Sequence, residues 1–428
     1  MDKIAFSRWK DAAAASVVFV LSLAALFVNG LTFSTGDSVP YRYLPEAIWE
    51  HRAFSLDMFP HLDAPENYAL VRDIHGNLVS KKPVSPALFE IPAFLIFRKI
   101  YQPFDAMERI LMGKWTMSIL AAFACAVLFL SLVRKVGFTI ATMSGLGLVI
   151  FTPFWFTAMD CWTHPILALM NILSLYLIGK RGTMFWVLTG FLQGIAVTAR
   201  LGAFPVFLVF AAFSFFMEGG SKKRWMNIVW FAVGAALPLI FLGLYNHAHF
   251  GSPFRSAFQG QSLNRIRFPF EGLAGFLFSP AKGLFLFSPI LILFPLGAFR
   301  IRNLGFQAPI ALIGIIAHIL FWSCYADWWG GWGFGARYLA EITPFIIFIN
   351  ALTVKFILAR FEKNWKKCLF VGFLILLLLL SFGNQIIGAF TWNGDYHAQF
   401  DKGWGDGKNW VWKAPFEPWW RWKIKASP

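Results

Sequence analysis

Long apolar segments alternate with short polar connections along most of the chain. Several of these segments are longer than the roughly 20 residues that a helix needs to cross a bilayer. Taken as helices, they predict membrane spans at about residues 12–32, 110–132, 138–157, 164–179, 184–199, 201–217, 226–245, 284–299, 306–326, 339–354 and 369–390. The pattern predicts an all-α polytopic membrane protein with about 11 transmembrane helices, within a range of roughly 10 to 13. We expect one membrane domain over residues 1–428, whose first apolar segment stays as a span and is not cleaved as a signal peptide.

The charged residues predict which side of the membrane each connection faces. Of the 428 residues, 58% are hydrophobic and 14% are charged, and the formal net charge is +16. The basic residues gather on alternate connections, at 3–10, 134–135, 180–181, 222–224, 300–302 and 355–367. This bias predicts a cytoplasmic N-terminus and argues against a nucleic-acid partner. The four cysteines have no metal-ligand spacing, so we expect them to pack as small hydrophobic side chains.

Three large segments fall on the outer face in this topology, at 33–109, 246–283 and 391–428. The first contains two candidate helices, Tyr41 to Arg52 and Ser85 to Tyr101. The second of these helices is apolar but too short and too interrupted by proline to span, so we expect it to lie in the membrane interface. The tail at 391–428 is rich in Trp, Lys and Arg, which predicts an aromatic and basic layer against membrane lipids.

An acid stands near the start of the first outer segment, in the stretch Thr35-Gly36-Asp37-Ser38-Val39-Pro40. A carboxylate near the membrane boundary is costly, which makes it a candidate functional group. As a general base, Asp37 could take the proton of a hydroxyl acceptor. The alternative is that Asp37 or Ser38 caps the helix that begins near Pro40.

Further polar candidates lie at the outer ends of the following spans. The connection between the third and fourth spans is Asp160-Cys161-Trp162-Thr163-His164. Asp160 and His164 could share a proton, hold an acceptor or ligate a metal ion, but two ligands are too few to define a metal site. Asp160 could equally cap the following helix. Arg200 either extends to the interface or clamps a lipid phosphate through its planar guanidinium group.

The outer segment at 246–283 is basic, against the positive-inside trend, because it carries Arg255, Arg265, Arg267 and Lys282. Anionic lipid headgroups or a phosphate-bearing substrate would each balance this charge. In the second case Arg255 and Lys282 are candidates to bind the substrate phosphate. His247 and His249 also lie here, but two such ligands do not define a metal site.

A loop rich in glycine and tryptophan joins the predicted spans at 306–326 and 339–354. Its sequence is Asp327-Trp328-Trp329-Gly330-Gly331-Trp332-Gly333-Phe334-Gly335-Ala336-Arg337-Tyr338. The glycines allow tight turns, and the rings of Trp328, Trp329, Trp332 and Tyr338 offer flat faces on which a sugar can stack. The loop therefore predicts a lipid-linked or carbohydrate ligand. An aromatic anchor without a ligand is the alternative.

Taken in order, these features resemble the polyprenyl-phosphate-sugar-dependent glycosyltransferases of the GT-C fold, a group that includes protein O-mannosyltransferases and the lipid A aminoarabinose transferase. The resemblance covers the architecture of most of the chain, from the cytoplasmic N-terminus to the interfacial helices of the long first outer loop, which opens with Gly36-Asp37. The stretches Tyr245 to Pro253, Phe278 to Leu284 and Gly331 to Leu339 look like those of uncharacterised bacterial members.

The resemblance implies roles for individual residues. Asp37 would be the general base, and Asp160 would correspond to the acid of the second outer loop. Arg200 and Arg337 would be donors to the phosphate. It also implies a multi-pass protein of the bacterial inner (plasma) membrane with its active face outside, and a polyprenyl-phosphate-linked sugar as donor. The acceptor could be a glycan, a lipid or a protein. Asp37 stands alone where some relatives carry paired acids, and the sequence holds no clear ligand set for a divalent metal ion, so metal dependence stays open.

This chemistry needs one base. The second pKa of a phosphate monoester is about 6, so a lipid phosphate can leave without being protonated. Arginines would stabilise the charge that grows on it as the sugar becomes oxocarbenium-like. A single base on the opposite face predicts inversion at the anomeric carbon. Three alternatives stay open. One is a transporter or flippase for a lipid-linked glycan, although the near absence of charged residues inside the spans disfavours it. The others are a glycan polymerase or ligase and a non-catalytic scaffold.

Overall fold

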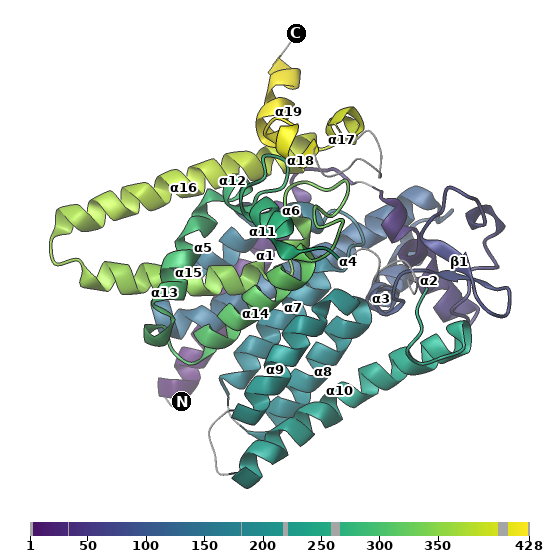
Figure 1. Ribbon diagram of the computed structural model, residues 1–428, viewed down its shortest axis with the longest axis horizontal. Helices are drawn as coiled ribbons and strands as arrows, with labels where there is room; N and C mark the ends of the chain where they lie inside the picture. Colours follow the sequence, from purple (N-terminus) through teal and green to yellow (C-terminus); the bar gives the residue numbers. More distant parts are fainter. Residues whose placement is uncertain are drawn as a thin grey trace. The chain divides into compact units, whose positions relative to one another are not determined.

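The computed structural model describes residues 3–32, 34–180, 182–216, 221–257, 266–400 and 410–426, and these residues are mainly helical (Figure 1). Arg181, Arg265 and residues 401–409 of the tail lie outside the described residues. The α-helices are α1 (Lys3–Phe27), α2 (Val39–Glu50), α3 (Ser85–Ile100), α4 (Ala106–Val136), α5 (Phe138–Ile150), α6 (Phe154–Thr157), α7 (His164–Ile178), α8 (Thr183–Ala199), α9 (Phe204–Phe216), α10 (Ser221–Phe250), α11 (Pro269–Phe278), α12 (Leu284–Phe287), α13 (Phe294–Phe299), α14 (Gln307–Ser323), α15 (Thr343–Arg360), α16 (Asn364–Thr391), α17 (Asp395–Phe400), α18 (Trp410–Lys413) and α19 (Glu417–Ala426).

Short elements connect these helices. The strands β1 (Leu70–Arg72) and β2 (Leu78–Ser80) form an antiparallel hairpin in which Val71 pairs with Val79. The 3-10 helices include η1 (Gly36–Ser38), η3 (Leu201–Ala203), η5 (Pro289–Leu293) and η7 (Arg337–Leu339).

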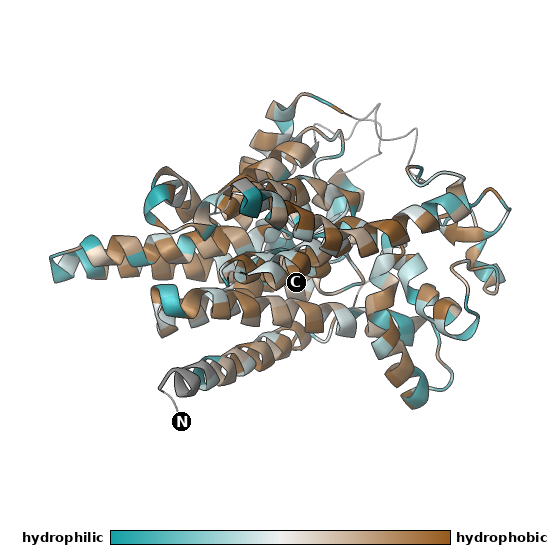
Figure 2. Ribbon diagram, turned by 90° about the horizontal axis from the view of Figure 1, so that it is seen from below, coloured by the Kyte–Doolittle hydropathy of each residue, from teal (hydrophilic) through white to brown (hydrophobic). Residues whose placement is uncertain are grey.

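The predicted apolar segments are helical, and the chain is an integral membrane protein. Five helices in the described residues are long and apolar enough to cross a membrane, at Trp9–Phe27, Ala106–Val136, Lys222–Phe250, Thr343–Arg360 and Asn364–Thr391. Six shorter apolar helices lie at Phe138–Ile150, His164–Ile178, Thr183–Ala199, Leu201–Phe216, Pro289–Phe299 and Gln307–Ser323. Figure 2 shows hydrophobic residues along most of each long helix and hydrophilic residues toward helix ends and connections. The two helices predicted in the first outer segment also form, as α2 and α3.

Two predicted spans differ from the structure because of proline. The segment at 284–299 was expected as one helix, but α12, η5 and α13 interrupt it around Pro289 and Pro295. The segment at 138–157 likewise breaks between α5 and α6, next to Pro153. Proline has no N–H to donate within a helix and clashes with the preceding turn, so it ends or kinks the helix.

The chain divides into two compact units, each built from separated stretches of sequence. We name them by a residue that each contains. The Asp37 unit comprises Thr32–Leu120 and Ala158–Arg265, and the Arg337 unit comprises Met1–Leu31, Ala121–Thr157 and Ile266–Pro428. The Asp37 unit thus holds α2, α3, the hairpin and α7 to α10. The Arg337 unit holds α1, α5, α6 and all helices from α11 onward.

Close backbone contact between α8 and α10 forms the centre of the Asp37 unit. A Cβ atom at Gly190 would lie 1.9 Å from the Phe231 carbonyl oxygen, and one at Gly234 would lie 1.9 Å from the Val187 carbonyl oxygen. Only glycine allows two helices to approach this closely, which is how small residues drive helix association in a membrane. Arg200, whose backbone is extended, separates α8 from η3 and α9, so the short helices expected at 184–199 and 201–217 are both present.

Candidate functional site

Asp37 lies in η1, immediately before α2. Its carboxylate is 27% exposed and lies 2.8 Å from the Lys82 ammonium group. The Tyr68 hydroxyl donates a hydrogen bond of 3.2 Å to the same oxygen, Oδ1. The N-cap residue of α2 is Ser38, which makes no side-chain capping bond. Asp37 is therefore not the residue that caps α2.

The hairpin brings Lys82 and Tyr68 to Asp37. Tyr68 precedes β1 and Lys82 follows β2, so the antiparallel pairing places both residues at the same end of the hairpin. Tyr68 also packs directly on the turn, because a Cβ atom at Gly36 would lie 2.4 Å from its ring. Neither Tyr68 nor Lys82 was predicted from the sequence. The turn residues Asp73 and Gly76 between two short apolar runs were the signal that could have predicted this hairpin.

Two hydrogen bonds fix the hairpin to the end of α10. Asp73 lies 2.7 Å from His249 Nδ1, and the backbone N–H of Ile74 donates to the His249 carbonyl oxygen. Burial raises the pKa of the Asp73 carboxyl, but the hydrogen bonds from His249, Asn77 and His75 more than offset this effect and lower it. His249 therefore has a structural partner in this protein.

Asp160 is buried under the Asp37 turn, with 1% of its side chain exposed. Its Oδ2 accepts hydrogen bonds from the Thr35 N–H (3.1 Å), the Thr35 hydroxyl (2.9 Å) and the Ser38 hydroxyl (2.6 Å). Its Oδ1 accepts the Cys161 N–H at 2.7 Å and lies 3.4 Å from the Arg42 guanidinium group. The N-cap residue of α7 is Thr163, so Asp160 does not cap this helix.

A second buried layer contains Glu90, Cys161 and Tyr41. The Cys161 thiol donates a hydrogen bond to the Glu90 carboxyl. Burial raises the pKa of Glu90 to about 8, and the nearby charge of Asp160 adds to this effect. Burial also raises the pKa of Tyr41, with the charges of Asp37 and Arg200 acting on it in opposite directions. Tyr41 therefore lies within electrostatic range of both residues. Neither Glu90 nor Tyr41 was predicted from the sequence as a site residue.

His164 and Arg200 form a pair in the Asp37 unit. The Arg200 guanidinium group donates to His164 Nδ1 at 3.2 Å, and His164 is buried. Arg255 is exposed, just past the end of α10. The predicted phosphate-binding roles of Arg200 and Arg255 stay predictions.

In the Arg337 unit, the glycine-rich loop wraps around the Arg337 side chain. Gly330 and Gly331 have positive φ angles of 74° and 65°, which favour glycine. A Cβ atom at Gly333 would lie 2.8 Å from Arg337 Cδ. The fully buried Lys282 holds the loop, because its ammonium group donates to the Gly331 carbonyl oxygen at 3.1 Å and also to that of Gly333. This geometry gives Lys282 a structural role and leaves its predicted phosphate contact a prediction.

The aromatic residues of this loop differ in exposure. Trp328 and Trp329 are buried, and Trp328 fits against Gly275, where a Cβ atom would overlap its ring. Trp332 is 42% exposed and stacks on His397 with ring centroids 5.9 Å apart. Tyr338 packs on Trp322 at 4.3 Å. The proposed sugar-stacking roles stay predictions, and Trp332 has the most accessible ring of the three tryptophans.

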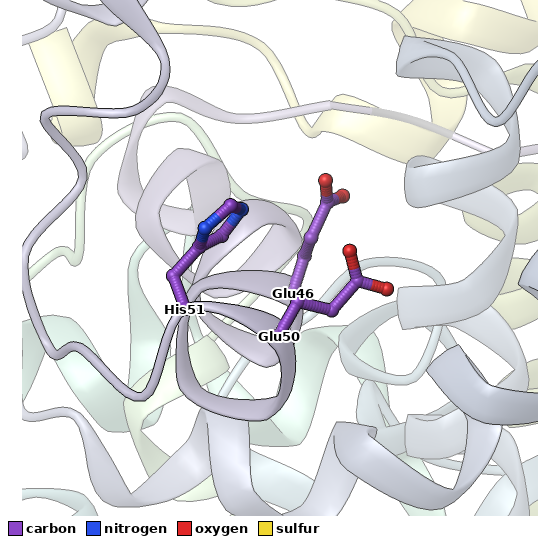
Figure 3. Close-up of side chains that lie close together, drawn as sticks. All are labelled: Glu46, Glu50 and His51. Carbon is purple, nitrogen blue, oxygen red and sulfur yellow. The ribbon is translucent and has the colours of Figure 1, made fainter.

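One group of side chains in the described residues could supply three metal ligands. Glu46, Glu50 and His51, at the end of α2, have ligand atoms within 4.8 Å of one another (Figure 3). However, Glu46 lies 2.5 Å from Arg109, and Glu50 forms an ion pair with Arg98. A divalent ion would have to displace both guanidinium groups, so these residues fit a metal ion poorly.

The Asp37 unit therefore presents a half-buried carboxylate beside a cation, above a network of buried polar groups. A carboxylate in this setting can accept a proton from a hydroxyl group, and Lys82 or Arg200 can face an anion.

Comparisons with known proteins identify the fold. No protein-family model and no curated protein sequence matches this chain. Among solved structures, ArnT from Cupriavidus metallidurans bound to undecaprenyl phosphate is similar, with a TM-score of 0.54 and 13% identity over 98% of this chain and 77% of that one. The archaeal oligosaccharyltransferase AglB from Archaeoglobus fulgidus, in complex with an inhibitory peptide and a dolichol-phosphate, gives a TM-score of 0.60 and 13% identity over 96% of this chain and 61% of that one. The GT-C fold that the sequence predicts is thus confirmed, and this polytopic membrane protein shares it with ArnT and AglB.

Proposed function

We propose that this protein is a membrane glycosyltransferase that moves a sugar from a polyprenyl-phosphate donor to a hydroxyl acceptor on the outer face of the membrane, with inversion. The observation that carries the proposal is the Asp37 carboxylate, half-buried and 2.8 Å from Lys82, in a chain with the fold of ArnT and AglB. The solved structures of these two proteins hold undecaprenyl phosphate and dolichol-phosphate, which supports a lipid phosphate as the leaving group.

In the proposed reaction, Asp37 takes the proton of the acceptor hydroxyl as its oxygen bonds to the anomeric carbon of the sugar. The bond from that carbon to the phosphate oxygen breaks, and both of its electrons leave with the lipid phosphate. Positive side chains stabilise the charge on the departing phosphate, for which we propose Arg200 and Lys82 of the Asp37 unit. A base opposite the leaving group gives inversion, and a product with retained configuration would contradict this mechanism.

The proposal is tested in cells and in vitro with a matched pair of variants. Asp37→Asn removes the base, and Glu66→Gln changes an exposed acid of the same outer segment as a control. Because a general base contributes about 10²- to 10⁴-fold to a rate, Asp37→Asn should lower transfer by that factor while Glu66→Gln leaves it unchanged. Surface glycans are compared by mass spectrometry in a deletion strain complemented with each variant. Normal glycans both in the deletion strain and with Asp37→Asn would remove the enzymatic proposal.

A further inference from the structure

Asp160 contacts the backbone and side chains on both sides of Asp37. Thr35, two residues before Asp37, donates its N–H and its hydroxyl to Asp160 Oδ2, and Ser38, the next residue after Asp37, donates its hydroxyl. Within the turn, the Ser38 N–H and hydroxyl donate to the Thr35 carbonyl oxygen at 3.2 Å and 2.9 Å, and the Val39 N–H donates to the Gly36 carbonyl oxygen. The backbone on both sides of Asp37 is thus also held by a carboxylate that comes from a distant connection of the chain.

We infer that Asp160 is a positioning residue, which fixes the turn from Thr35 to Ser38 and so holds Asp37 in place. The inference rests on the proposed function, and it changes the role that the family resemblance implies for Asp160. The carboxylate would act through Asp37 and would contact neither the acceptor nor a metal ion.

The contacts of Asp160 leave little capacity for a substrate. An ionised carboxylate offers about four acceptor positions. Here three hydrogen bonds reach Oδ2, and Oδ1 is contacted by the Cys161 N–H and the Arg42 guanidinium group. Only 1% of the side chain is exposed. An acceptor hydroxyl or a metal ion could bind only after several of these hydrogen bonds break.

Arg42 completes the arrangement by joining the acid to the turn. Its guanidinium group donates to the Ser38 hydroxyl at 2.6 Å and to the Thr35 carbonyl oxygen at 3.2 Å. It also balances the buried charge of Asp160, with which it forms an ion pair. The Trp162 ring N–H donates to the Thr35 hydroxyl at 3.0 Å, so three residues hold Thr35 and Ser38 from one side.

Two measurements on the full-length protein test the positioning role. The first is hydrogen exchange of the peptide covering 34–44, in lipid nanodiscs without substrate. Asp160→Asn, Asp160→Ala and Ser38→Ala should speed the exchange of the Thr35 amide, with Asp160→Ala causing about a tenfold or greater change because its acceptor is lost. The second is steady-state transfer from a polyprenyl-phosphate sugar. A misplacement near 1 Å lowers catalysis about 10²-fold, so kcat should fall by about that factor in Asp160→Ala while KM for the donor stays within about twofold.

The combined variant separates positioning from direct contact. If Asp160 and Ser38 act through the same turn, the double variant Asp160→Ala/Ser38→Ala should be no slower than Asp160→Ala alone. Added Mn²⁺ or Mg²⁺ should not restore activity. If the alanine variant fails to fold, the same measurements are made on Asp160→Asn, which keeps an acceptor oxygen.

Three outcomes would overturn the inference. The first is an Asp160 variant that loses activity while the hydrogen exchange of the turn stays unchanged. The second is an Asp160 variant whose activity returns with a divalent ion. The third is an Asp160 variant whose turn exchanges faster but which keeps full activity. Failure of the proposed function is a separate result, because it appears as full activity of Asp37→Asn. The exchange measurement does not depend on any activity.

Discussion

The Lys82 ammonium group lies 2.8 Å from the Asp37 carboxylate, although the two residues are separated by α2 and the hairpin. This pair places a cation beside the proposed base, where it can compensate the charge of Asp37 and face a donor phosphate. Lys82→Gln should therefore lower kcat/KM for the lipid-phosphate donor about tenfold or more, since a hydrogen bond to a charged group contributes about 1.5–3 kcal/mol. Lys99→Gln, which changes an exposed lysine of α3, is the control and should leave kcat/KM unchanged. Equal kinetics for the two variants would contradict a functional role for Lys82.

The contact of Tyr68 with Gly36 predicts a coupled pair of substitutions. Gly36→Ala would place a methyl group 2.4 Å from the Tyr68 ring and push the ring aside, which breaks the hydrogen bond to Asp37. Tyr68→Phe removes the same bond directly, so each change should lower kcat about fivefold, as expected for a bond near 1 kcal/mol. The double variant should be no slower than either single one, because both act on one contact. Gly383→Ala, at a glycine with open space around it, is the control, and additive effects would disprove the coupling.

The predictions from sequence were accurate where the signal is local. Apolar runs predicted the helices on both sides of Arg200, because hydrophobic length alone decides whether a segment can be buried in lipid. They failed at Pro289, where the missing N–H outweighs hydrophobicity. The sequence made Asp37 a candidate because an acid near the membrane boundary is unusual, and its catalytic role stays a prediction. Lys82 and Glu90 were not predicted. The position of Lys82 beside Asp37 depends on how the hairpin folds back, and that of Glu90 beside Cys161 depends on how α3 folds back.

The buried Glu90 predicts a pH dependence of stability. Burial raises its pKa from the ordinary 4.5 to about 8, so between these values the folded protein holds a proton that the unfolded chain has released. Stability must then fall as pH rises from about 5 to about 8 and level off above that pH, by a few kcal/mol at most. Glu90→Gln keeps the size of the side chain and cannot ionise, so its unfolding midpoint should lack this decrease.

The measurement is the unfolding temperature of the wild type, Glu90→Gln and the exposed control Glu66→Gln, in the same detergent from pH 5 to pH 9. The control should follow the wild type. A slope that is the same in wild type and Glu90→Gln would assign the pH dependence to other groups.

A substitution of Lys282 can distinguish two roles for this residue, which are holding the glycine-rich loop and binding a phosphate. It is fully buried and donates to the carbonyl oxygens of Gly331 and Gly333, so Lys282→Met leaves both acceptors without this donor. Unsatisfied buried polar groups cost about 1–3 kcal/mol each, so the unfolding temperature should fall clearly, whereas Lys355→Met, at an exposed lysine of α15, should leave it unchanged.

The second readout for Lys282→Met is its affinity for undecaprenyl phosphate, measured below the unfolding transition. A lysine that only holds the loop should leave this affinity within about twofold, because its ammonium group already serves two carbonyl oxygens. Unchanged stability together with binding weakened about tenfold or more would return Lys282 to the phosphate site that the basic outer segment predicts.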